Sequence, residues 1–598
     1  MTALAGLLRA KGHEVRGSDG ALYPPTSDVL AGMKTEVYDG FAPSNLDWNP
    51  DVVVVGNVCS ESHPEVQAAK ERGLRLASMP ETLAKELLTD KQSFVVTGTH
   101  GKTTTSSLLA HILVEAKRDP SWFVGGVPVS GGFGFHLGKG NEFVIEGDEY
   151  DSAFFGKESK FLHYRPKAAV LTSAELDHLD IFANLDAVLA AFRKFVGLIP
   201  PEGYLLVQQG ETEVGIAKSA NCTVETYEVL KGDQSPTSDG ASWQATKLEY
   251  LPNGRSQFEI WHHGELFGNF ESVLGGDYNA GNVVAAVALG HRAGVSAAEL
   301  EEAVFSFAGV RRRQEIRGVA QGVFVIDDYA HHPTSVCLTL QGLRHKFPGR
   351  RLIALFEPRS ASSRRRAFEN DYAEALSNAD VVIVGKPYGS AKGDDVFLSK
   401  EVAVAVHQSG ARATAIDNID ETVSYVKDMA RPGDVVVVMS SGAFGGIHGK
   451  LLVALGDAVT RATAADAEQL HELLKALDLK WQSVVDNPAN FLILNNEDGF
   501  AGCVCLEVFR REAVLRSLAV KKESRGIGYG WLLADRAIDV AKRRGVRRVY
   551  IATESASDFF AAKLGFRVVD QSTISEQVLQ SKAFRDRSSS EVTMRLDL

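Results

Sequence analysis

Short apolar runs alternate with segments of helical apolar spacing along most of the chain, a pattern typical of α/β domains with parallel sheets. Near the N-terminus it predicts strands at 14–17, 52–55 and 74–77, with helices at 64–72 and 80–88. The predicted strands farther along are 143–146, 168–172, 323–327, 352–356, 381–384 and 435–439. We therefore expect an α/β fold over most of the chain.

Two segments depart from this alternation. Residues 204–274 are richer in strand patterns and end at a predicted helix over 278–294. After Gly456 the pattern restarts with a helix at 464–477, followed by predicted strands at 491–495, 502–509 and 513–520. The order of helix and then consecutive strands predicts an α+β unit at the C-terminus.

The length of 598 residues exceeds what one hydrophobic core can organise, so we expect several domains. The shifts in pattern predict four units, at 1–90, 91–312, 313–457 and 459–598.

Composition and charge narrow the class of protein. The net charge of −12 argues against a general binder of nucleic acid or acidic membranes. Five scattered cysteines are typical of a reduced protein rather than of a disulfide framework. No apolar run reaches the roughly 18 residues of a membrane span, and no signal peptide is recognisable. We therefore expect a cytoplasmic protein with no nucleic-acid or membrane partner.

The stretch from Val95 to Thr105 carries the strongest chemical signal. A strand end runs into V-V-T-G-T-H-G-K-T-T-T, which predicts a phosphate-binding loop. Glycines let backbone N–H groups approach an anion, and the following helix N-terminus favours negative charge. Lys102 can reach terminal phosphates, and the Thr103 hydroxyl can hold Mg²⁺. The alternative is an ordinary glycine-containing turn, which would not need the Lys-Thr pair.

A helix is predicted directly after this loop. Its apolar positions Leu108, Leu109, Ile112 and Leu113 share one face, so we expect an amphipathic helix.

Two clusters downstream are rich in carboxylates, and the second also contains a histidine. Residues 146–151 read E-G-D-E-Y-D at a strand end, an oxygen-rich set of the kind that Mg²⁺ prefers. Residues 175–180 read E-L-D-H-L-D after a second strand, which makes His178 a candidate metal or phosphate contact. A solvated acidic turn and a structural histidine are the alternatives.

Three polar features follow farther along the chain. Asn279 and Asn282 share one face at a helix start, where they could contact a purine or simply cap the helix. Arg313 ends a run of arginines, and Asp328 stands at a strand end, where parallel sheets bind ligands.

The order of these motifs resembles the Mur ligase family, whose ATP-dependent members join amino acids or peptides to UDP-N-acetylmuramate. The family loop G-T-x-G-K-T-T matches residues 98–104. The resemblance implies an ATP site formed by Gly98, Thr99, His100, Gly101, Lys102, Thr103, Thr104, Asn279, Asn282, Arg313 and Asp328. It implies Mg²⁺ ligands at Thr103, Glu149 and His178. It implies catalytic roles for Lys102, Glu149, His178, Arg313 and Asp328.

The resemblance also implies an architecture and a reaction. The architecture is a Rossmann-like N-terminal domain that binds UDP-sugar, a P-loop ATPase central domain and a Rossmann-like C-terminal domain that binds the incoming peptide. The family's reaction passes through an acyl phosphate. Several stretches favour the branch that attaches the tripeptide L-Ala-γ-D-Glu-meso-diaminopimelate in cell-wall recycling, namely 23–25, 149–155, 161–166, 356–360 and 442–448.

The N-terminus departs from the family pattern. The family's UDP-contacting glycine loop comes first, whereas this sequence opens directly on a helix pattern. We therefore expect that the chain starts late, which puts binding of the UDP-sugar in doubt. Ser18, Asp19 and Asn57 are the remaining candidates for uridine-side contacts.

From about residue 459 the chain resembles the GNAT acetyltransferases. A strand over 515–520 precedes R-G-I-G-Y-G at 525–530, which fills the family pattern [QR]-x-x-G-x-[GA], and F-F-A-A-K-L-G-F follows at 559–566. Such a loop holds the pyrophosphate of acetyl-CoA at a helix N-terminus. The resemblance implies an acetyl-CoA site formed by Leu518, Val520, Arg525, Gly526, Gly528 and Gly530.

The sequence leaves two alternatives to a tripeptide ligase fused to an acetyltransferase. The first is the related ligase that attaches single L-alanine. The second is an inactive nucleotide-binding scaffold in which only the acetyltransferase works.

Overall fold

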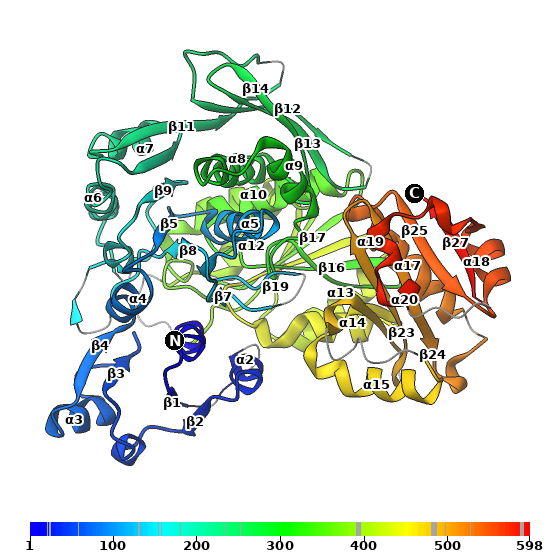
Figure 1. Ribbon diagram of the computed structural model, residues 1–598. Helices are drawn as coiled ribbons and strands as arrows, with labels where there is room; N and C mark the ends of the chain where they lie inside the picture. The colour runs from blue at the N-terminus through cyan, green and yellow to red at the C-terminus, as the bar shows by residue number, and fades with distance from the viewer. Residues whose placement is uncertain are drawn as a thin grey trace.

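The structure is a computed structural model that describes residues 1–20, 22, 26–57, 59–129, 132–152, 155–156, 158–179, 181–232, 234–251, 253–389, 396–479, 487–496, 498–526, 528–585 and 591–598. Some residues of the motifs named above lie outside the described residues, namely 23–25, 153–154, Asp180 and Ile527. Figure 1 shows the N-terminal segment (blue) at one end of the molecule and the last segment (orange to red) at the other.

The N-terminal segment forms two parallel strand pairs. β1 (Arg16–Asp19) pairs with β2 (Glu36–Asp39), and β3 (Val52–Val55) pairs with β4 (Arg75–Ser78). The helices around them are α1 (Thr2–Ala10), α2 (Thr26–Gly32), η1 (Pro43–Leu46), α3 (Pro64–Glu71) and α4 (Met79–Leu87). The sequence predicted one parallel sheet here; among the described residues no strand joins the two pairs.

The central segment is built on a sheet of order β14-β13-β12-β11-β10-β9-β5-β8-β6-β7. Its strands are β5 (Gln92–Thr97), β6 (Ser121–Phe123), β7 (Phe135–His136), β8 (Glu142–Gly147), β9 (Ala168–Leu171), β10 (Tyr204–Gln208), β11 (Thr223–Val229), β12 (Trp243–Tyr250), β13 (Ser256–His262) and β14 (Glu265–Ser272). Its helices are α5 (Lys102–Glu115), η3 (Lys160–His163), α6 (Leu185–Val196), α7 (Glu211–Ala217), α8 (Asp277–Arg292) and α9 (Ala297–Ser306).

Helix α5 is buried on nearly every side, so the prediction of an amphipathic helix was wrong. Its polar residues Thr104, Thr105 and Ser106 are buried together with its leucines. The cause is tertiary, because α5 packs against the sheet at β8 on one side and against α8 and α9 on the other. A helix enclosed in this way has no solvent face for polar residues to mark.

A second sheet continues through the rest of the molecule in the order β19-β18-β17-β20-β16-β15-β21-β22-β23-β24-β25-β27-β26. The strands before residue 456 are β15 (Glu315–Ala320), β16 (Val323–Asp328), β17 (Leu352–Phe356), β18 (Val381–Val384), β19 (Arg412–Ala415) and β20 (Val435–Met439). Their helices are α10 (Pro333–Lys346), η4 (Arg366–Phe368), α11 (Glu369–Leu376), α12 (Ser399–Gln408), α13 (Ile419–Met429), η5 (Phe444–Gly446) and α14 (Ile447–Leu455).

The last part of the chain completes this sheet. Its strands are β21 (Ala458–Arg461), β22 (Phe491–Asn496), β23 (Gly499–Phe509), β24 (Glu512–Val520), β25 (Arg548–Thr553), β26 (Arg567–Val568) and β27 (Val592–Asp597). Its helices are η6 (Ala464–Asp466), α15 (Ala467–Ala476), η7 (Pro488–Asn490), η8 (Lys522–Ser524), α17 (Tyr529–Arg543), α18 (Ser557–Leu564), η9 (Gln571–Thr573), α19 (Glu576–Leu579) and α20 (Lys582–Arg585).

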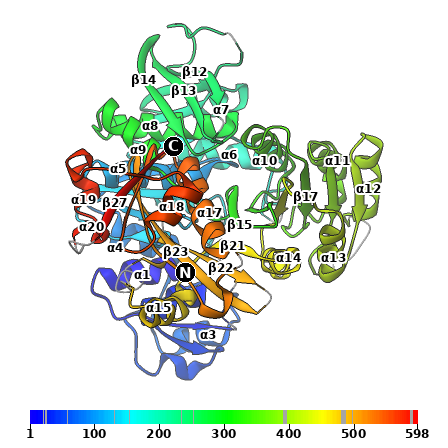
Figure 2. The same cartoon turned by 90° about the vertical axis from the view of Figure 1, so that its right-hand side faces the viewer.

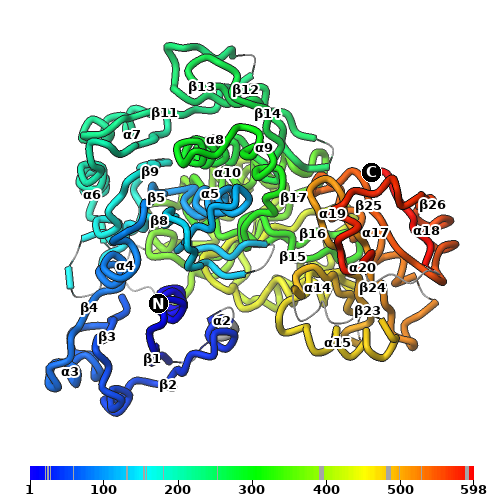
Figure 3. The backbone as a smooth tube through the Cα atoms, viewed as in Figure 1, coloured from blue at the N-terminus to red at the C-terminus, as the bar shows by residue number. Residues whose placement is uncertain are grey.

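Strand β21 joins the two halves of this sheet. It pairs antiparallel with β15 through Val459 and Val319, and antiparallel with β22 through Val459 and Leu494. The turned view in Figure 2 shows β15, β21 and β22 side by side. The tube in Figure 3 shows that the last segment lies apart from the blue N-terminal strand pairs. Within the described part of the chain, no helix has the length and hydropathy that crossing a membrane requires.

Candidate functional site

The loop between β5 and α5 has the backbone that the glycine pattern predicts. Gly98 has φ of +126° and Gly101 has φ of +82°, a region that favours glycine. A Cβ at Gly98 would lie 2.3 Å from Thr172 Oγ1, and a Cβ at Gly101 would lie 2.4 Å from Asn282 Oδ1. Only glycine therefore allows the loop to lie this close to its neighbours, with the N-terminus of α5 opening at Gly101.

Lys102, Glu149 and His178 come together beside this loop. The Lys102 ammonium donates to Glu149 Oε1 at 3.0 Å and to Oε2 at 2.9 Å, and His178 Nε2 lies 3.1 Å from Glu149 Oε1. Glu149 is only 3% exposed, so its charge acts in a medium of low polarity. Burial alone lowers the pKa of Lys102, but the charges of Glu149 and Asp148 raise it above its ordinary value. The three groups therefore form one charged unit.

The same carboxylate also controls His178. Burial opposes its protonation, but the hydrogen bond and charge of Glu149 raise the pKa of His178. In return, Lys102 and His178 lower the pKa of Glu149 against the effect of its burial.

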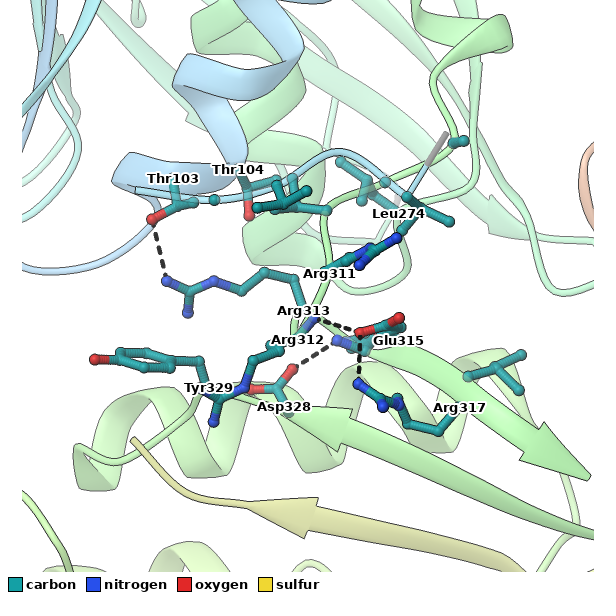
Figure 4. A pocket seen from close by; sticks show the side chains of 18 of the residues that line it. Thr103, Thr104, Leu274, Arg311, Arg312, Arg313, Glu315, Arg317, Asp328 and Tyr329 are labelled. Atoms are coloured by element: carbon teal, nitrogen blue, oxygen red, sulfur yellow. Dashed lines mark hydrogen bonds and ion pairs between the residues drawn. The ribbon is translucent and has the colours of Figure 1, made fainter. Parts of the chain in front are cut away.

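Thr103 and Arg313 meet across the cleft, as Figure 4 shows. Arg313 Nη2 donates to Thr103 Oγ1 at 3.2 Å, while Thr103 Oγ1 donates to Glu146 Oε1 at 2.8 Å. Thr103 thus contacts Glu146 rather than Glu149. The Arg313 guanidinium also lies 5.2 Å from the ring centre of Tyr329.

Asp328 is held at the end of β16 by backbone groups. Its oxygens accept from the N–H groups of Gln314 and Ala330, both at 2.8 Å. Burial raises the pKa of Asp328, although the charge of Arg313 acts in the opposite sense. Figure 4 shows Asp328 below the arginine run.

The two asparagines hold α5 and α8 together. Asn282 Nδ2 donates to Asn279 Oδ1 at 3.0 Å, and Asn282 Oδ1 accepts from Thr105 at 3.2 Å. Asn279 Nδ2 donates to the Gly275 carbonyl at 2.8 Å. Both asparagines are buried and still line the cleft.

A cavity of about 1450 Å³ connects most of the predicted ATP-site residues. Those that line it are Thr99, His100, Gly101, Lys102, Thr103, Thr104, His178, Asn279, Asn282, Arg313 and Asp328. Glu149 does not line the cavity but contacts Lys102 and His178, which do. The Gly98 carbonyl accepts a hydrogen bond from the Lys102 ammonium at 2.6 Å. The structure thus gathers around one cavity residues that stand far apart in the sequence.

The predicted uridine-side residues do not reach this cavity. Ser18 and Asp19 lie on β1, where Asn45 donates to the Ser18 hydroxyl at 3.2 Å. Asn57 donates to the carbonyl of Asp151 at 2.7 Å. None of the three is among the residues that line the cavity.

Several lining residues carried no predicted role. Glu146 and Asp177 lie within the two acidic motifs, and His331 follows Asp328. Asp177 lies 3.9 Å from His331 Nε2, and burial lowers the pKa of His331 to about 4. The sequence indicated these residues only as members of the acidic and histidine motifs. It did not show which members of a motif have side chains that face the cavity.

A second group of possible metal ligands lies on the same side of the loop. One ligand atom each from His100, Glu175 and His332 lies within 4.8 Å of the others. Since His332 comes from a segment far from His100 in the sequence, only the fold brings them together.

The C-terminal part has its own cavity, of about 1140 Å³, at the start of α17. All six predicted acetyl-CoA residues line it, namely Leu518, Val520, Arg525, Gly526, Gly528 and Gly530. β24 and β25 pair over Glu512–Val514 and Arg548–Tyr550, and within the described residues the rest of β24 has no strand partner on that side. Tyr529, which we expected in the loop, is the first residue of α17, and its hydroxyl donates to Asp457 at 3.1 Å.

Family models match the chain in four places. The Mur ligase family catalytic domain matches residues 1–90, and the Mur ligase middle domain matches residues 96–290. The Mur ligase glutamate ligase domain matches residues 312–442, and the acetyltransferase (GNAT) family matches residues 458–566.

Curated relatives agree with these matches. The UDP-N-acetylmuramate--L-alanyl-gamma-D-glutamyl-meso-2,6-diaminoheptandioate ligase of Escherichia coli (strain K12) is 38% identical over 453 residues, which are 76% of this chain and 95% of that relative. The UDP-N-acetylmuramate--L-alanine ligase of Clostridium acetobutylicum is 30% identical over 445 residues, or 74% of this chain and 93% of that relative.

Solved structures support the same assignment. A murein peptide ligase from Psychrobacter arcticus 273-4 gives a TM-score of 0.58 at 32% identity, covering 76% of this chain and 96% of that one. The UDP-N-acetylmuramate-alanine ligase of Thermotoga maritima shares the fold, with a TM-score of 0.62 at 22% identity over 76% of this chain and 95% of that one. The predicted three-domain architecture with an added GNAT unit is thereby confirmed. The chain belongs to the Mur ligase family and carries a GNAT acetyltransferase domain after its ligase part.

Proposed function

We propose that the ligase part joins UDP-N-acetylmuramate to the tripeptide L-Ala-γ-D-Glu-meso-diaminopimelate, with ATP as the energy source. The observation that carries this proposal is the meeting of Lys102, Glu149 and His178 beside the glycine loop, in a chain 38% identical to a ligase named for that reaction. The proposal also includes the four domain boundaries predicted above, the roles of the individual site residues and a cytoplasmic location.

The reaction needs negative groups to meet, and the cleft supplies positive charge for this. Lys102 stands where the glycine loop ends and α5 begins, and Arg313 reaches Thr103 beside it, so two cations lie at the positive end of the α5 dipole. The muramate carboxylate would attack the γ-phosphorus, ADP would leave, and the peptide amine would then displace phosphate from the acyl carbon. Lys102 would balance the phosphate charge, and Asp328 would keep Arg313 in place.

The residues present fit a magnesium ion. Thr103, Glu146 and Glu149 offer hard oxygen donors, and His178 stands next to them. Mg²⁺ would neutralise the triphosphate charge when bound. Thr103, Glu149 and His178 are the proposed ligands, with Glu146 as a candidate that the structure adds.

We propose that the GNAT domain transfers an acetyl group from acetyl-CoA to an acceptor not specified by the chain. The loop from Arg525 to Gly530 opens α17 as an anion-binding helix N-terminus, and Arg525 Nε is fixed on the Val520 carbonyl at 3.0 Å.

Isotope transfer tests the acyl phosphate directly. With ¹⁸O in the muramate carboxylate, the mechanism predicts one ¹⁸O atom in each phosphate released, measured by mass spectrometry. Phosphate that carries no ¹⁸O would contradict it.

A substrate panel separates the competing functions. ADP release should require UDP-N-acetylmuramate and the tripeptide together. Preference for free L-alanine would support the function of the Clostridium acetobutylicum relative instead. ATP binding without turnover on any substrate would support the scaffold alternative.

A further inference from the structure

A row of cationic side chains lies where the ligase part meets the acetyltransferase domain. The large cavity continues past Arg313 to this wall, and its lining there includes Arg311, Arg317, Lys346, Arg461, Arg536, Arg543 and Arg544. Figure 4 shows Arg311 and Arg317 at the ligase edge of this region. The last three arginines come from α17 and its C-cap: Arg536 lies in the middle of the helix, and Arg543 and Arg544 lie at the end away from the acetyl-CoA loop.

These cations lie close enough to repel one another. The guanidinium carbons of Arg536 and Arg543 lie 5.5 and 5.1 Å from the ring centre of Phe324. Burial, followed by the charge of Arg461, lowers the pKa of Arg544 to about 9. Burial and then the charge of Arg543 lower the pKa of Lys346 to about 8. Strand β21, which supplies Arg461, thus brings ligase and acetyltransferase cations into one electrostatic group.

The described carboxylates balance only part of this charge. Asp539 pairs with Arg536 and lies 3.2 Å from Arg543, and Glu315 lies 3.8 Å from Arg317. Four members have no ion pair with any carboxylate in the described ranges, namely Arg311, Lys346, Arg461 and Arg544. Arg461 donates to the Ala489 carbonyl at 2.7 Å.

Half-buried cations of like sign destabilise a fold unless an anion joins them. Guanidinium groups pair with phosphate oxygens in fixed bidentate geometry, and a polyphosphate places several charges within a few ångströms. We propose that this wall, defined by Arg311, Lys346, Arg461 and Arg544, binds the linked phosphate groups of a nucleotide, at a site separate from the one at Lys102. A ligand here would contact both catalytic parts of the chain.

Pyrophosphate binding to the full chain tests the proposal. The Lys102→Met chain also carries Arg525→Met, so that both the lysine of the glycine loop and the arginine of the acetyl-CoA loop are lost and the remaining binding reports on the wall. Calorimetry of this variant should show saturable binding of about one pyrophosphate per chain. Adding Arg461→Met or Arg544→Met should lower the affinity for pyrophosphate at least roughly tenfold. Arg567→Met on the exposed strand β26 is the matched control and should leave the affinity unchanged.

The melting temperature separates a ligand site from a purely structural cluster. Without pyrophosphate, Arg544→Met should melt no lower than its parent, because it relieves repulsion. Absence of pyrophosphate binding to the Lys102→Met chain would overturn the proposal. A lower melting temperature in Arg544→Met with unchanged pyrophosphate affinity would overturn it too.

Competition then identifies the source of the phosphates. Displacement of pyrophosphate from the Lys102→Met chain by ATP points to a nucleoside triphosphate, and displacement by coenzyme A points to the phosphates of that cofactor. Displacement by neither overturns the assignment to a nucleotide. Neither UDP-N-acetylmuramate, nor the tripeptide, nor turnover enters these measurements, so they can fail while the proposed ligase function stands.

Discussion

At the scale of single residues, one carboxylate organises the cleft. Glu149 contacts the ammonium of Lys102 and the imidazole of His178 at the same time, and it is almost fully buried. The sequence motifs indicated all three residues, because each stands in a short run of unusual composition. Their mutual distances depend on β8 and on the segment after β9, which no local pattern specifies.

Glu149→Gln should lower ADP formation by roughly 10²–10³-fold, because it removes the charge that positions Lys102 and His178. It should also lower the pKa of His178, measured by NMR titration, since the effect of burial is then opposed by the charge of Asp177 but no longer by Glu149. Glu211→Gln, at an exposed position on α7, is the control. An unchanged His178 titration in the Glu149 variant would contradict this account.

His331 predicts a pH dependence of stability. Its folded pKa of about 4 lies below the ordinary 6.5, so the unfolded chain binds a proton in this range that the folded chain does not. The free energy of unfolding should therefore fall as the pH drops from about 6.5 to 4, by up to roughly 3 kcal/mol. Denaturant titration of His331→Gln should show a smaller fall. Equal falls in both proteins would refute the assignment.

At the scale of elements, burial decided which predictions were confirmed. The strands β17, β18 and β20 have the bounds that were expected, because each is a continuous apolar run buried on both faces. Helix α5 was predicted with a solvent face and has almost none, since α8 and α9 cover it. A helix pattern reports apolar positions but not how many neighbours surround them.

The glycine loop gives a test at this scale. Gly101→Ala should lower stability by roughly 1–3 kcal/mol and prevent binding of a nonhydrolysable ATP analogue, because of its positive φ and the clash with Asn282. Gly215→Ala in the interior of α7 meets no atom within 4 Å and should raise stability by about 0.5–1 kcal/mol. Thermal unfolding and calorimetry measure both effects, and equal effects would contradict the backbone argument.

At the scale of the whole molecule, one sheet links two catalytic parts. β21 pairs with β15 of the ligase part and with β22 of the acetyltransferase domain. The sequence indicated the change of fold near residue 457 but not this pairing, since Ala458–Arg461 is short and has no distinctive pattern. At the N-terminus the sequence predicted strands near β1, β3 and β4, but neither β2 nor the division of these strands into two separate pairs.

Val459→Pro should disturb both sides of β21, because proline removes the Val459 N–H from one ladder and, by fixing φ at about −65°, bends the strand that forms the other. Hydrogen exchange should increase in β16 and in β23 together. Val459→Ala keeps the N–H and should change exchange far less. Increased exchange confined to one side would argue against a mechanically continuous sheet.

The central claim is that Lys102 serves an ATP-dependent ligation in the shared cleft. The most direct measurement is ADP release by Lys102→Ala with UDP-N-acetylmuramate and tripeptide, beside circular dichroism of the same sample. The account predicts loss of peptide-dependent ADP formation with an unchanged folded spectrum. Near-normal turnover in that variant would contradict it.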